Sequence, residues 1–325
     1  MLDIVLGIVF YILRYFAVIV PLLIALAYFT LCDRKIMGAM QRRIGPAVVG
    51  PYGLLQPLAD GLKLVIKENI APIRVNRFLY TFAPTLTFVI SMVCWVLIPL
   101  TPTFVSSDPG LGLLFVFATS SLGIYGIIIS GWSSNSKYPL FGALRASAQM
   151  ISYEVSMGLI YVCVGLCAGS YNLTEIVLAQ KEIWFAVPLL PLFIIYLVSM
   201  LAETNRTPFD LAEAEAELVA GYSSEYSGVN VSLFFMAEYA NMLLLSALCI
   251  ILFCGGWLIG PFGSGLFFTA KMVCFVFYFV WVRGTFPRYR YDQLMQICWK
   301  MYLPISLFYV IFVSLVLFIF NGFPC

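Results

Sequence analysis

The chain has 325 residues, of which 62% are hydrophobic and only 10% are charged, with a net charge of +2. No soluble fold hides that much apolar surface, so the chain is expected to lie in a membrane. The absence of histidine excludes haem ligation of the usual kind and histidine-based zinc sites.

Long apolar runs predict the membrane-spanning helices, because a helical span needs roughly 20 apolar residues. Four stretches without a charged side chain are the runs between Arg77 and Asp108, from Pro109 to Ser136, from Ile183 to Ala202 and from Met301 to Cys325. Four further candidates contain or adjoin a charge, and they are Phe16 to Leu31, Ala146 to Ala168, Val231 to Cys254 and Phe267 to Val282. We therefore predict an all-α polytopic fold with about eight spans, forming a single transmembrane domain over residues 1–325. A closed barrel would show short alternating segments instead.

The N-terminal run from Met1 to Leu31 lacks a basic segment before its apolar residues, so we expect it to be retained and not removed as a signal peptide. The nine cysteines contain no C-x-x-C pair and lie mostly inside apolar runs. We assign them to packing and expect no metal site.

Lys and Arg residues are distributed unevenly between the loops, and this asymmetry predicts the orientation. Eight of the 18 lie in the first loop, namely Arg34, Lys35, Arg42, Arg43, Lys63, Lys67, Arg74 and Arg77. The third, fifth and seventh loops hold seven more, whereas the even loops are short and nearly uncharged. Odd loops are expected to face the cytoplasm or the mitochondrial matrix, and function is expected on that side.

The first inner loop contains an amphipathic helix from Leu54 to Glu68. Its leucines cover one arc, while Lys63, Lys67 and Asp60 lie opposite. About 15 residues cannot span a bilayer, so this helix is expected to lie in the interface plane. Shape alone favours a simple connector over the wall of a pocket for a lipid-soluble molecule.

The fifth inner loop, from Ala202 to Tyr226, is the most acidic segment of the chain. Six of the sixteen carboxylates lie here, namely Glu203, Asp210, Glu213, Glu215, Glu217 and Glu225, with Arg206 as the single opposing charge. Two single acids, Glu154 and Glu238, lie inside flanking apolar helices, where a carboxyl usually faces a partner or a wet cavity. Together the loop and the two buried acids favour a proton path over a solvated surface with locally paired groups.

The seventh inner loop, from Arg283 to Met295, mixes arginines and aromatic residues with Asp292. Residue types alone leave three roles open: binding of acidic lipid headgroups, neutralisation of the acidic loop, and docking of a soluble subunit.

These segments together resemble subunit 1 of NADH:quinone oxidoreductase, the respiratory complex I, over nearly the whole chain. The resemblance is carried by Asp33-Arg-Lys35, Gln41-Arg-Arg-Ile-Gly-Pro46, Gly50 to Lys63, Gly131 to Tyr138, Ala148-Gln-Met-Ile-Ser-Tyr-Glu-Val-Ser156, Ala202 to Tyr226 and Pro287 to Leu294. It departs from the family at three positions, because the family usually has Glu at Asp33, Pro at Asn69 and Ala at Gly284. The first departure shortens a carboxylate and leaves the ion-pair geometry there open.

The resemblance implies a membrane subunit that completes a quinone chamber and couples quinone reduction to proton translocation. Its implied quinone contacts are Arg34, Arg43, Asp60 and Phe209. Its implied proton path comprises Glu154, Glu203, Asp210, Glu213, Glu215, Glu217, Glu225 and Glu238. Its implied balancing charges are Arg206, Arg283, Arg288 and Arg290.

Ubiquinone is the implied substrate, with NADH, FMN and iron–sulfur clusters confined to partner subunits and no catalysis by this chain alone. The implied partners are the other subunits of the membrane and peripheral arms and membrane lipids, with no nucleic acid. The mitochondrial inner membrane is favoured over a bacterial inner membrane. Three alternatives are the membrane subunit of an energy-converting hydrogenase, a stand-alone cation or proton transporter, and an assembly scaffold.

Overall fold

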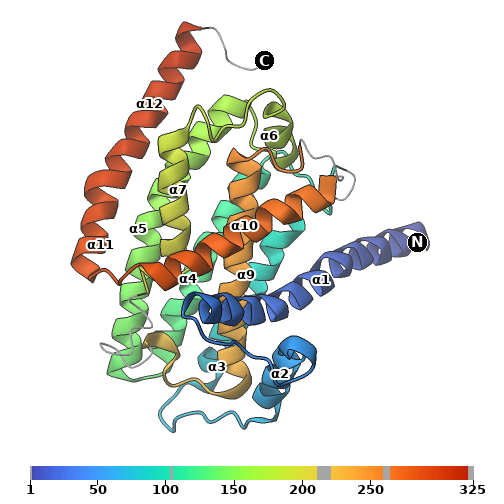
Figure 1. The fold of residues 1–325 in the computed structure, drawn as a ribbon, viewed down its shortest axis with the longest axis vertical. Helices are drawn as coiled ribbons and strands as arrows, with labels where there is room; N and C mark the ends of the chain where they lie inside the picture. Colours follow the sequence, from blue (N-terminus) through green and yellow to red (C-terminus); the bar gives the residue numbers. More distant parts are fainter. Residues whose placement is uncertain (1, 103–104, 211–220, 259–263, 321–325) are drawn as a thin grey trace.

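The structure is a computed structural model that describes residues 2–102, 105–210, 221–258 and 264–320, with backbone only for residues 2–12 and 264. Within these ranges the chain forms helices and no strands. The longer helices are α1 (Leu2–Met40), α2 (Gln56–Ile66), α3 (Arg77–Cys94), α4 (Gly112–Ser133), α5 (Lys137–Ala168), α7 (Leu190–Glu203), α9 (Gly228–Phe253), α10 (Ser264–Thr285) and α12 (Leu303–Ile319). The seven-residue helices are α6 (Leu173–Ala179) and α11 (Tyr291–Ile297). Figure 1 shows their arrangement.

Among the described residues, seven helical segments are long enough and apolar enough to cross a membrane. They are Leu13–Met40, Arg77–Leu97, Gly112–Ser133, Lys137–Ala168, Gly228–Phe253, Gly265–Thr285 and Tyr291–Ile319. The predicted all-α polytopic fold is therefore confirmed.

The fifth predicted span is shorter than expected. Its helix, α7, has 14 residues, and the preceding segment from Ile183 to Leu189 is not helical, with turns over Phe185 to Leu189. Pro188 and Pro191 delay the start of the helix, because proline restricts the residue before it and is favoured only in the first helical turn. At about 1.5 Å per residue, α7 is shorter than the hydrocarbon layer that a lone helix must cross.

Helices α5 and α9 form the centre of the bundle. Every residue of α9 from Met242 to Phe253 is buried, and α9 packs against α3, α7 and α10. Helix α5 packs against α4, α7 and α12. The central place of α9 in Figure 1 agrees with this burial, and it puts the acid that α9 carries, Glu238, inside the bundle.

Helices α3 and α4 approach each other closely at Gly126. A Cβ at Gly126 would lie 2.2 Å from the Thr87 Cγ2 atom and 3.3 Å from the Ala83 carbonyl oxygen. Small residues permit such close helix contacts in membranes. Gly123, one turn earlier on α4, has no such neighbour within 4 Å.

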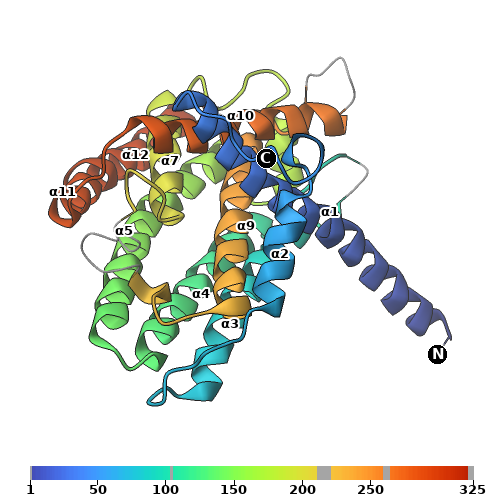
Figure 2. The same ribbon diagram turned by 60° about the horizontal axis from the view of Figure 1, so that its bottom comes forward.

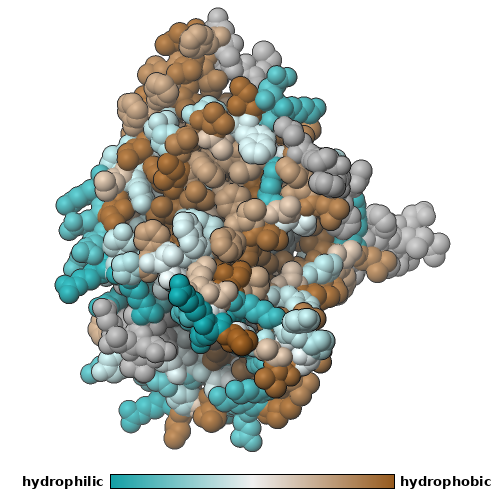
Figure 3. Space-filling view, viewed as in Figure 1, coloured by the Kyte–Doolittle hydropathy of each residue, from teal (hydrophilic) through white to brown (hydrophobic). Residues whose placement is uncertain are grey.

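The ends of the bundle differ in composition. Helix α2, the loop before α9 and the start of α5 lie toward the lower end in Figure 1, whereas α6 lies at the upper end. Figure 2 shows the N-terminal part of α1 pointing away from the bundle. Apolar side chains cover α12 and much of the upper part of the face in Figure 3, and hydrophilic side chains gather along its lower part. The end of the bundle at which these predicted inner-loop segments lie is thus also its more hydrophilic end.

Candidate functional site

An open groove of about 450 Å³ lies between α1, α2 and α9. Its lining residues are Leu26, Ala27, Thr30, Arg34, Pro57, Asp60, Gly61, Leu64, Val65, Ser232, Phe235, Met236 and Tyr239. Most of these side chains are apolar, as in typical sites for lipid-like or aromatic ligands. A few polar groups in such a lining fix the orientation of a ligand.

Arg34 and Asp60 supply the main polar feature of the groove. The Arg34 Nη1 atom donates to the Asp60 Oδ2 atom at 2.7 Å, and the other Asp60 oxygen accepts from Gln56 Nε2 at 2.9 Å. The side chains of Arg34 and Asp60 are 53% and 35% exposed. An ion pair this exposed adds little stability, so a ligand could exchange for one of its partners at small cost.

The predicted amphipathic helix is present as α2, which begins two residues later and ends two residues earlier than Leu54 and Glu68. Leu58, Leu62 and Val65 are 65%, 64% and 73% exposed. Proline near its first turn is favourable, because the missing N–H has no helical acceptor there. The exposed apolar face fits a helix that lies against lipid at the membrane surface.

Two tight contacts place α2 beside the rest of the bundle. Gly53, just before α2, has φ +76°, and a Cβ there would lie 2.2 Å from the Pro46 carbonyl oxygen. After α2, the Asn69 Oδ1 atom accepts from the Val229 backbone N–H at 3.0 Å. Asn69, where the family usually has proline, thus ties the end of α2 to the start of α9.

A second pocket, of about 360 Å³, lies directly beside the groove and shares Arg34 with it. Its lining residues are Asp33, Arg34, Met37, Arg43, Ile44, Gly45, Pro46 and Arg283. The Arg283 guanidinium donates to the Asp33 carboxylate at 2.6 Å. Arg34 and Arg43, two predicted quinone contacts, therefore line one continuous region.

Arg206 and Glu238 form the next charged pair toward the interior. Their Nε and Oε1 atoms lie 2.5 Å apart, and both side chains are almost completely buried. The Arg206 guanidinium also lies over the Tyr239 ring, 4.7 Å from its centroid. A small cavity of about 10 Å³ is lined by residues of two charged pairs, namely Asp33 and Arg283 of one and Arg206 of the other, and by Tyr239. The Arg283–Asp33 and Arg206–Glu238 pairs therefore adjoin each other.

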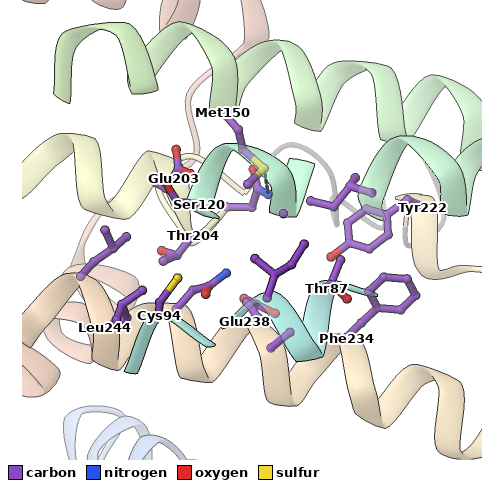
Figure 4. A pocket seen from close by; sticks show the side chains of 17 residues that line it. Thr87, Cys94, Ser120, Met150, Glu203, Thr204, Tyr222, Phe234, Glu238 and Leu244 are labelled. Atoms are coloured by element: carbon purple, nitrogen blue, oxygen red, sulfur yellow. Dashed lines mark hydrogen bonds between the residues drawn. The ribbon is translucent and has the colours of Figure 1, made fainter. Parts of the chain in front are cut away.

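Glu238 and Glu203 line a further buried cavity of about 70 Å³ (Figure 4). Figure 4 shows the two carboxylates on side chains from different helices, with Thr204 between them. Glu203 in turn interacts electrostatically with Glu154, which accepts a hydrogen bond from the Ser121 hydroxyl. The structure thus brings together Glu154, Glu203 and Glu238 from three helices.

Gln149 holds the segment that carries Glu203 and Arg206. Its Nε2 atom donates to the Ala202 carbonyl at 2.8 Å and to the Phe209 carbonyl at 3.0 Å. Gln149 is fully buried on α5. One side chain therefore fixes both ends of the segment 202–209.

Three further predicted site residues, Phe209, Asp210 and Arg288, lie near the C-terminal end of the segment 202–209. Phe209 is buried and stacks on Tyr289, with ring centroids 5.7 Å apart, and it lines none of the cavities described above. Its contact with a quinone stays a prediction. Asp210 accepts from Arg288 at 3.0 Å, and the balancing role of Arg288 stays a prediction.

Glu225 lines none of the cavities described above and lies beside a stacked pair of tyrosines. Its backbone carbonyl accepts from the Tyr80 hydroxyl at 2.6 Å, and the Tyr80 and Tyr226 rings stack at 4.1 Å. Burial raises the pKa of the Tyr226 hydroxyl, although its hydrogen bond with Ser133 partly opposes that shift. Tyr226 is therefore a neutral hydrogen-bonding group.

Arg290 is a predicted balancing charge that is not brought into this arrangement. Within the described ranges, Arg290 has no carboxylate partner and instead begins α11, where its backbone N–H donates to Gln293. The predicted proton-path residues Glu213, Glu215 and Glu217 lie outside the described residues. The described part of the chain also holds no group of three His, Cys, Asp or Glu side chains suited to a metal ion.

The structure adds residues that were not predicted as site residues from the sequence. Asp33 was noted only as a departure from the family, and its pairing with Arg283 joins residues 250 positions apart. Tyr239, Gln149 and Asn205 were not singled out at all. A polar residue inside an apolar run was the available signal for Gln149, whereas nothing local distinguishes Tyr239 or Asn205.

Comparisons with known proteins agree with the resemblance seen in the motifs. A family model described as NADH dehydrogenase matches residues 13–314. The chain is 55% identical over 320 residues to NADH-ubiquinone oxidoreductase chain 1 of Chondrus crispus, covering 96% of this chain and 98% of that protein. It is 54% identical to a bacterial NADH-quinone oxidoreductase subunit, from Paramagnetospirillum magneticum, covering 96% and 94%. It is also 54% identical to NADH-ubiquinone oxidoreductase chain 1 of Arabidopsis thaliana, covering 94% and 97%.

Proposed function

This chain belongs to the NADH dehydrogenase family, and from that membership we propose that it forms part of the quinone-binding chamber of a proton-pumping NADH:quinone oxidoreductase and of the acidic path that couples the two activities. It is a membrane subunit of this respiratory enzyme and a component of complex I. Its proposed partners are the other subunits of the membrane and peripheral arms and membrane lipids. NADH, FMN and iron–sulfur clusters are proposed to bind only to partner subunits.

A multi-pass position in an inner membrane follows from the same membership. Relatives named as ubiquinone oxidoreductases and as quinone oxidoreductases both match, and the described residues contain seven apolar helices of spanning length. The mitochondrial inner membrane is the favoured location, with the bacterial inner membrane as the alternative.

The groove between α1, α2 and α9 is the proposed route by which ubiquinone reaches its chamber. Its apolar lining suits an isoprenoid tail, and the exposed leucine face of α2 lies beside it. Arg34, Asp60 and, in the adjoining pocket, Arg43 would contact the polar headgroup as it passes. Phe209 would contribute from the buried segment beside Tyr289.

One observation supports the proposed coupling: ion pairs and shared cavities relate a series of ionisable side chains between the groove and the bundle interior. The series begins with the Arg34–Asp60 pair, continues through Arg283–Asp33 and Arg206–Glu238, and ends with Glu203 and Glu154. Reduction of a quinone to a quinol takes up two electrons and two protons. Charge that develops in a site with little water acts strongly on nearby ionisable groups, because the local dielectric is low.

The other predicted acids would extend this path toward the peripheral arm. Asp210 pairs with Arg288, and Glu225 lies beside Tyr80. Glu213, Glu215 and Glu217 belong to the same inner loop in the sequence. Arg290 would balance their charge from the start of α11.

A substitution that fills the groove tests the proposed quinone route. A Cβ at Gly61 meets no atom within 4 Å, so Gly61→Leu adds a side chain beside the groove without strain in the protein. In the assembled complex we expect the KM for a long-tailed ubiquinone to rise about tenfold, with a smaller change for a short-tailed analogue. The matched control is Gly110→Leu, since Gly110 is equally open but borders no groove residue. Equal effects of both variants on both quinones would refute the route.

The coupling is tested separately at the inner end of the series. Glu154→Gln keeps the size of the side chain but removes its acidity. We expect this variant to assemble and to lose proton translocation, measured as protons moved per electron in liposomes. An assembled Glu154→Gln complex that pumps with full stoichiometry would remove Glu154 from the path.

A further inference from the structure

Asn205 is a buried polar residue whose side-chain oxygen has no hydrogen-bond partner among the described residues. It follows the end of α7, and its side chain is 9% exposed. The Asn205 Nδ2 atom donates to the Met150 sulfur at 3.6 Å, whereas no described residue donates to its Oδ1 atom. A buried amide oxygen without a hydrogen bond is costly and is usually satisfied by ordered water.

The Asn205 side chain borders the same cavity as two acids of the path. Glu203, Glu238 and Asn205 all line the cavity of about 70 Å³ (Figure 4). The Glu203 Oε2 atom also lacks a hydrogen-bond partner among the described residues. Since a water molecule needs about 10–15 Å³ of such space, the cavity has room for several waters. Two buried acceptor oxygens thus face one space that water can occupy.

We propose that Asn205 is a positioning residue of the proton path, whose side-chain oxygen orders the water that bridges Glu203 and Glu238. This inference rests on the proposed coupling function. In the step, the protonated carboxyl of one acid gives its proton to the adjacent water, and each water passes one proton on. A new O–H bond then forms at the carboxylate of the other acid. One proton has moved, and the waters are unchanged.

The backbone at Asn205 determines which substitutions can test this role. Asn205 has φ +49°, a left-handed conformation that Gly, Asn and Asp adopt readily. Asn205→Gly removes the oxygen without backbone strain, and Asn205→Asp keeps an acceptor at the same position. Asn135 offers a matched control, because it has the same φ of +49° but lies on the surface and borders none of the cavities described above.

The experiment measures the assembled complex in liposomes. For Asn205→Gly we expect kcat of pumping-coupled quinone reduction to fall about tenfold, the loss expected for one hydrogen bond in the rate-limiting step. The KM for quinone should stay unchanged, and the solvent deuterium isotope effect should increase because proton transfer then limits turnover. Asn205→Asp should restore kcat, and Asn135→Gly should leave kcat and the isotope effect at their normal values.

Three results would overturn the inference. One is a normal kcat and isotope effect in assembled Asn205→Gly complexes, including the case in which only the amount of assembled complex falls. The second is a slow Asn205→Gly variant that Asn205→Asp does not restore. The third is an equal loss in Asn135→Gly. A parallel Glu203→Gln variant separates the two proposals, because full pumping by Glu203→Gln contradicts the proposed coupling path itself. Loss of pumping in Glu203→Gln with normal turnover in Asn205→Gly contradicts only the role of Asn205.

Discussion

The Arg283 guanidinium donates to the Asp33 carboxylate at 2.6 Å, although the two residues are 250 positions apart in the chain. This contact joins the C-terminal parts of α1 and α10 beside the pocket that also contains Arg34 and Arg43. The Asp33 side chain is 9% exposed and the Arg283 side chain 38% exposed. The pair is therefore partly shielded from solvent, unlike the Arg34–Asp60 pair in the groove.

Removal of the charge at Asp33 should weaken the packing of α1 against α10. For Asp33→Asn we expect a loss of about 1–2 kcal/mol, between the values for exposed and fully buried pairs. The measurement is the temperature at which the assembled complex loses quinone reductase activity. A double-variant cycle with Arg283→Gln gives the coupling energy, and a value near zero would show that the contact does not stabilise the protein.

Asn69 should hold the end of α2 in place. Asn69→Ala removes the acceptor of the Val229 backbone N–H, so we expect a loss of about 0.5–1.5 kcal/mol. We also expect faster amide hydrogen exchange of Val229 and the residues around it, measured by mass spectrometry on the assembled complex. The control is Asn230→Ala, which removes the amide side chain of the residue after Val229. Identical exchange in the two variants would contradict this role for Asn69.

The close approach of α3 and α4 should make Gly126 intolerant of a methyl group. Gly126→Ala brings a Cβ within 2.2 Å of the Thr87 Cγ2 atom, so the Thr87 side chain or one of the helices must shift, at a cost of about 1–3 kcal/mol. Gly123→Ala on the same helix meets no atom within 4 Å and should stabilise the helix slightly. We would compare the Gly126→Ala and Gly123→Ala variants by the fraction of assembled complex and by its thermal inactivation temperature. Equal tolerance would mean that the two helices separate at little cost.

Lys271 should stabilise the outer end of α9. Its ammonium donates to the Cys254 carbonyl at 2.5 Å and to the Gly256 carbonyl at 2.9 Å, and it lies over the rings of Trp184 and Phe267. Lys271→Met leaves these carbonyls without their charged donor, so we expect a loss of about 1.5–3 kcal/mol. Thermal inactivation of the assembled complex measures the loss, with the exposed Lys181→Met as control. An unchanged inactivation temperature in Lys271→Met would show that these hydrogen bonds from the Lys271 ammonium do not stabilise the protein.

The spans and the interfacial helix were predictable from the sequence because their signals are local. An uninterrupted apolar run predicts a span wherever it occurs, and the amphipathic pattern located α2 to within two residues at each end. The fifth span was predicted too long, because its apolar composition concealed the effect of Pro188 and Pro191 on where α7 begins. Hydropathy reports burial in lipid, whereas backbone restriction decides helix length.

The site was predictable as a set of residues but not as an arrangement. The sequence identified Glu154, Glu203 and Glu238 as acids in or beside apolar helices, and the structure brings them together. Pairing between distant residues, such as Arg206 with Glu238, depends on how the helices pack and has no local signal. The role of Asn205 depends on an unsatisfied oxygen, which becomes visible only when its surroundings are known.

The two hydrogen bonds from Gln149 restrict how this region can change length. The Gln149 amide on α5 donates to the carbonyls of both Ala202 and Phe209. An inserted or deleted residue between these two positions would therefore break one of the two hydrogen bonds. Changes in length between Ala202 and Phe209 are therefore expected to be poorly tolerated. The number of residues between Glu203 and Arg206 is thus constrained by these two hydrogen bonds.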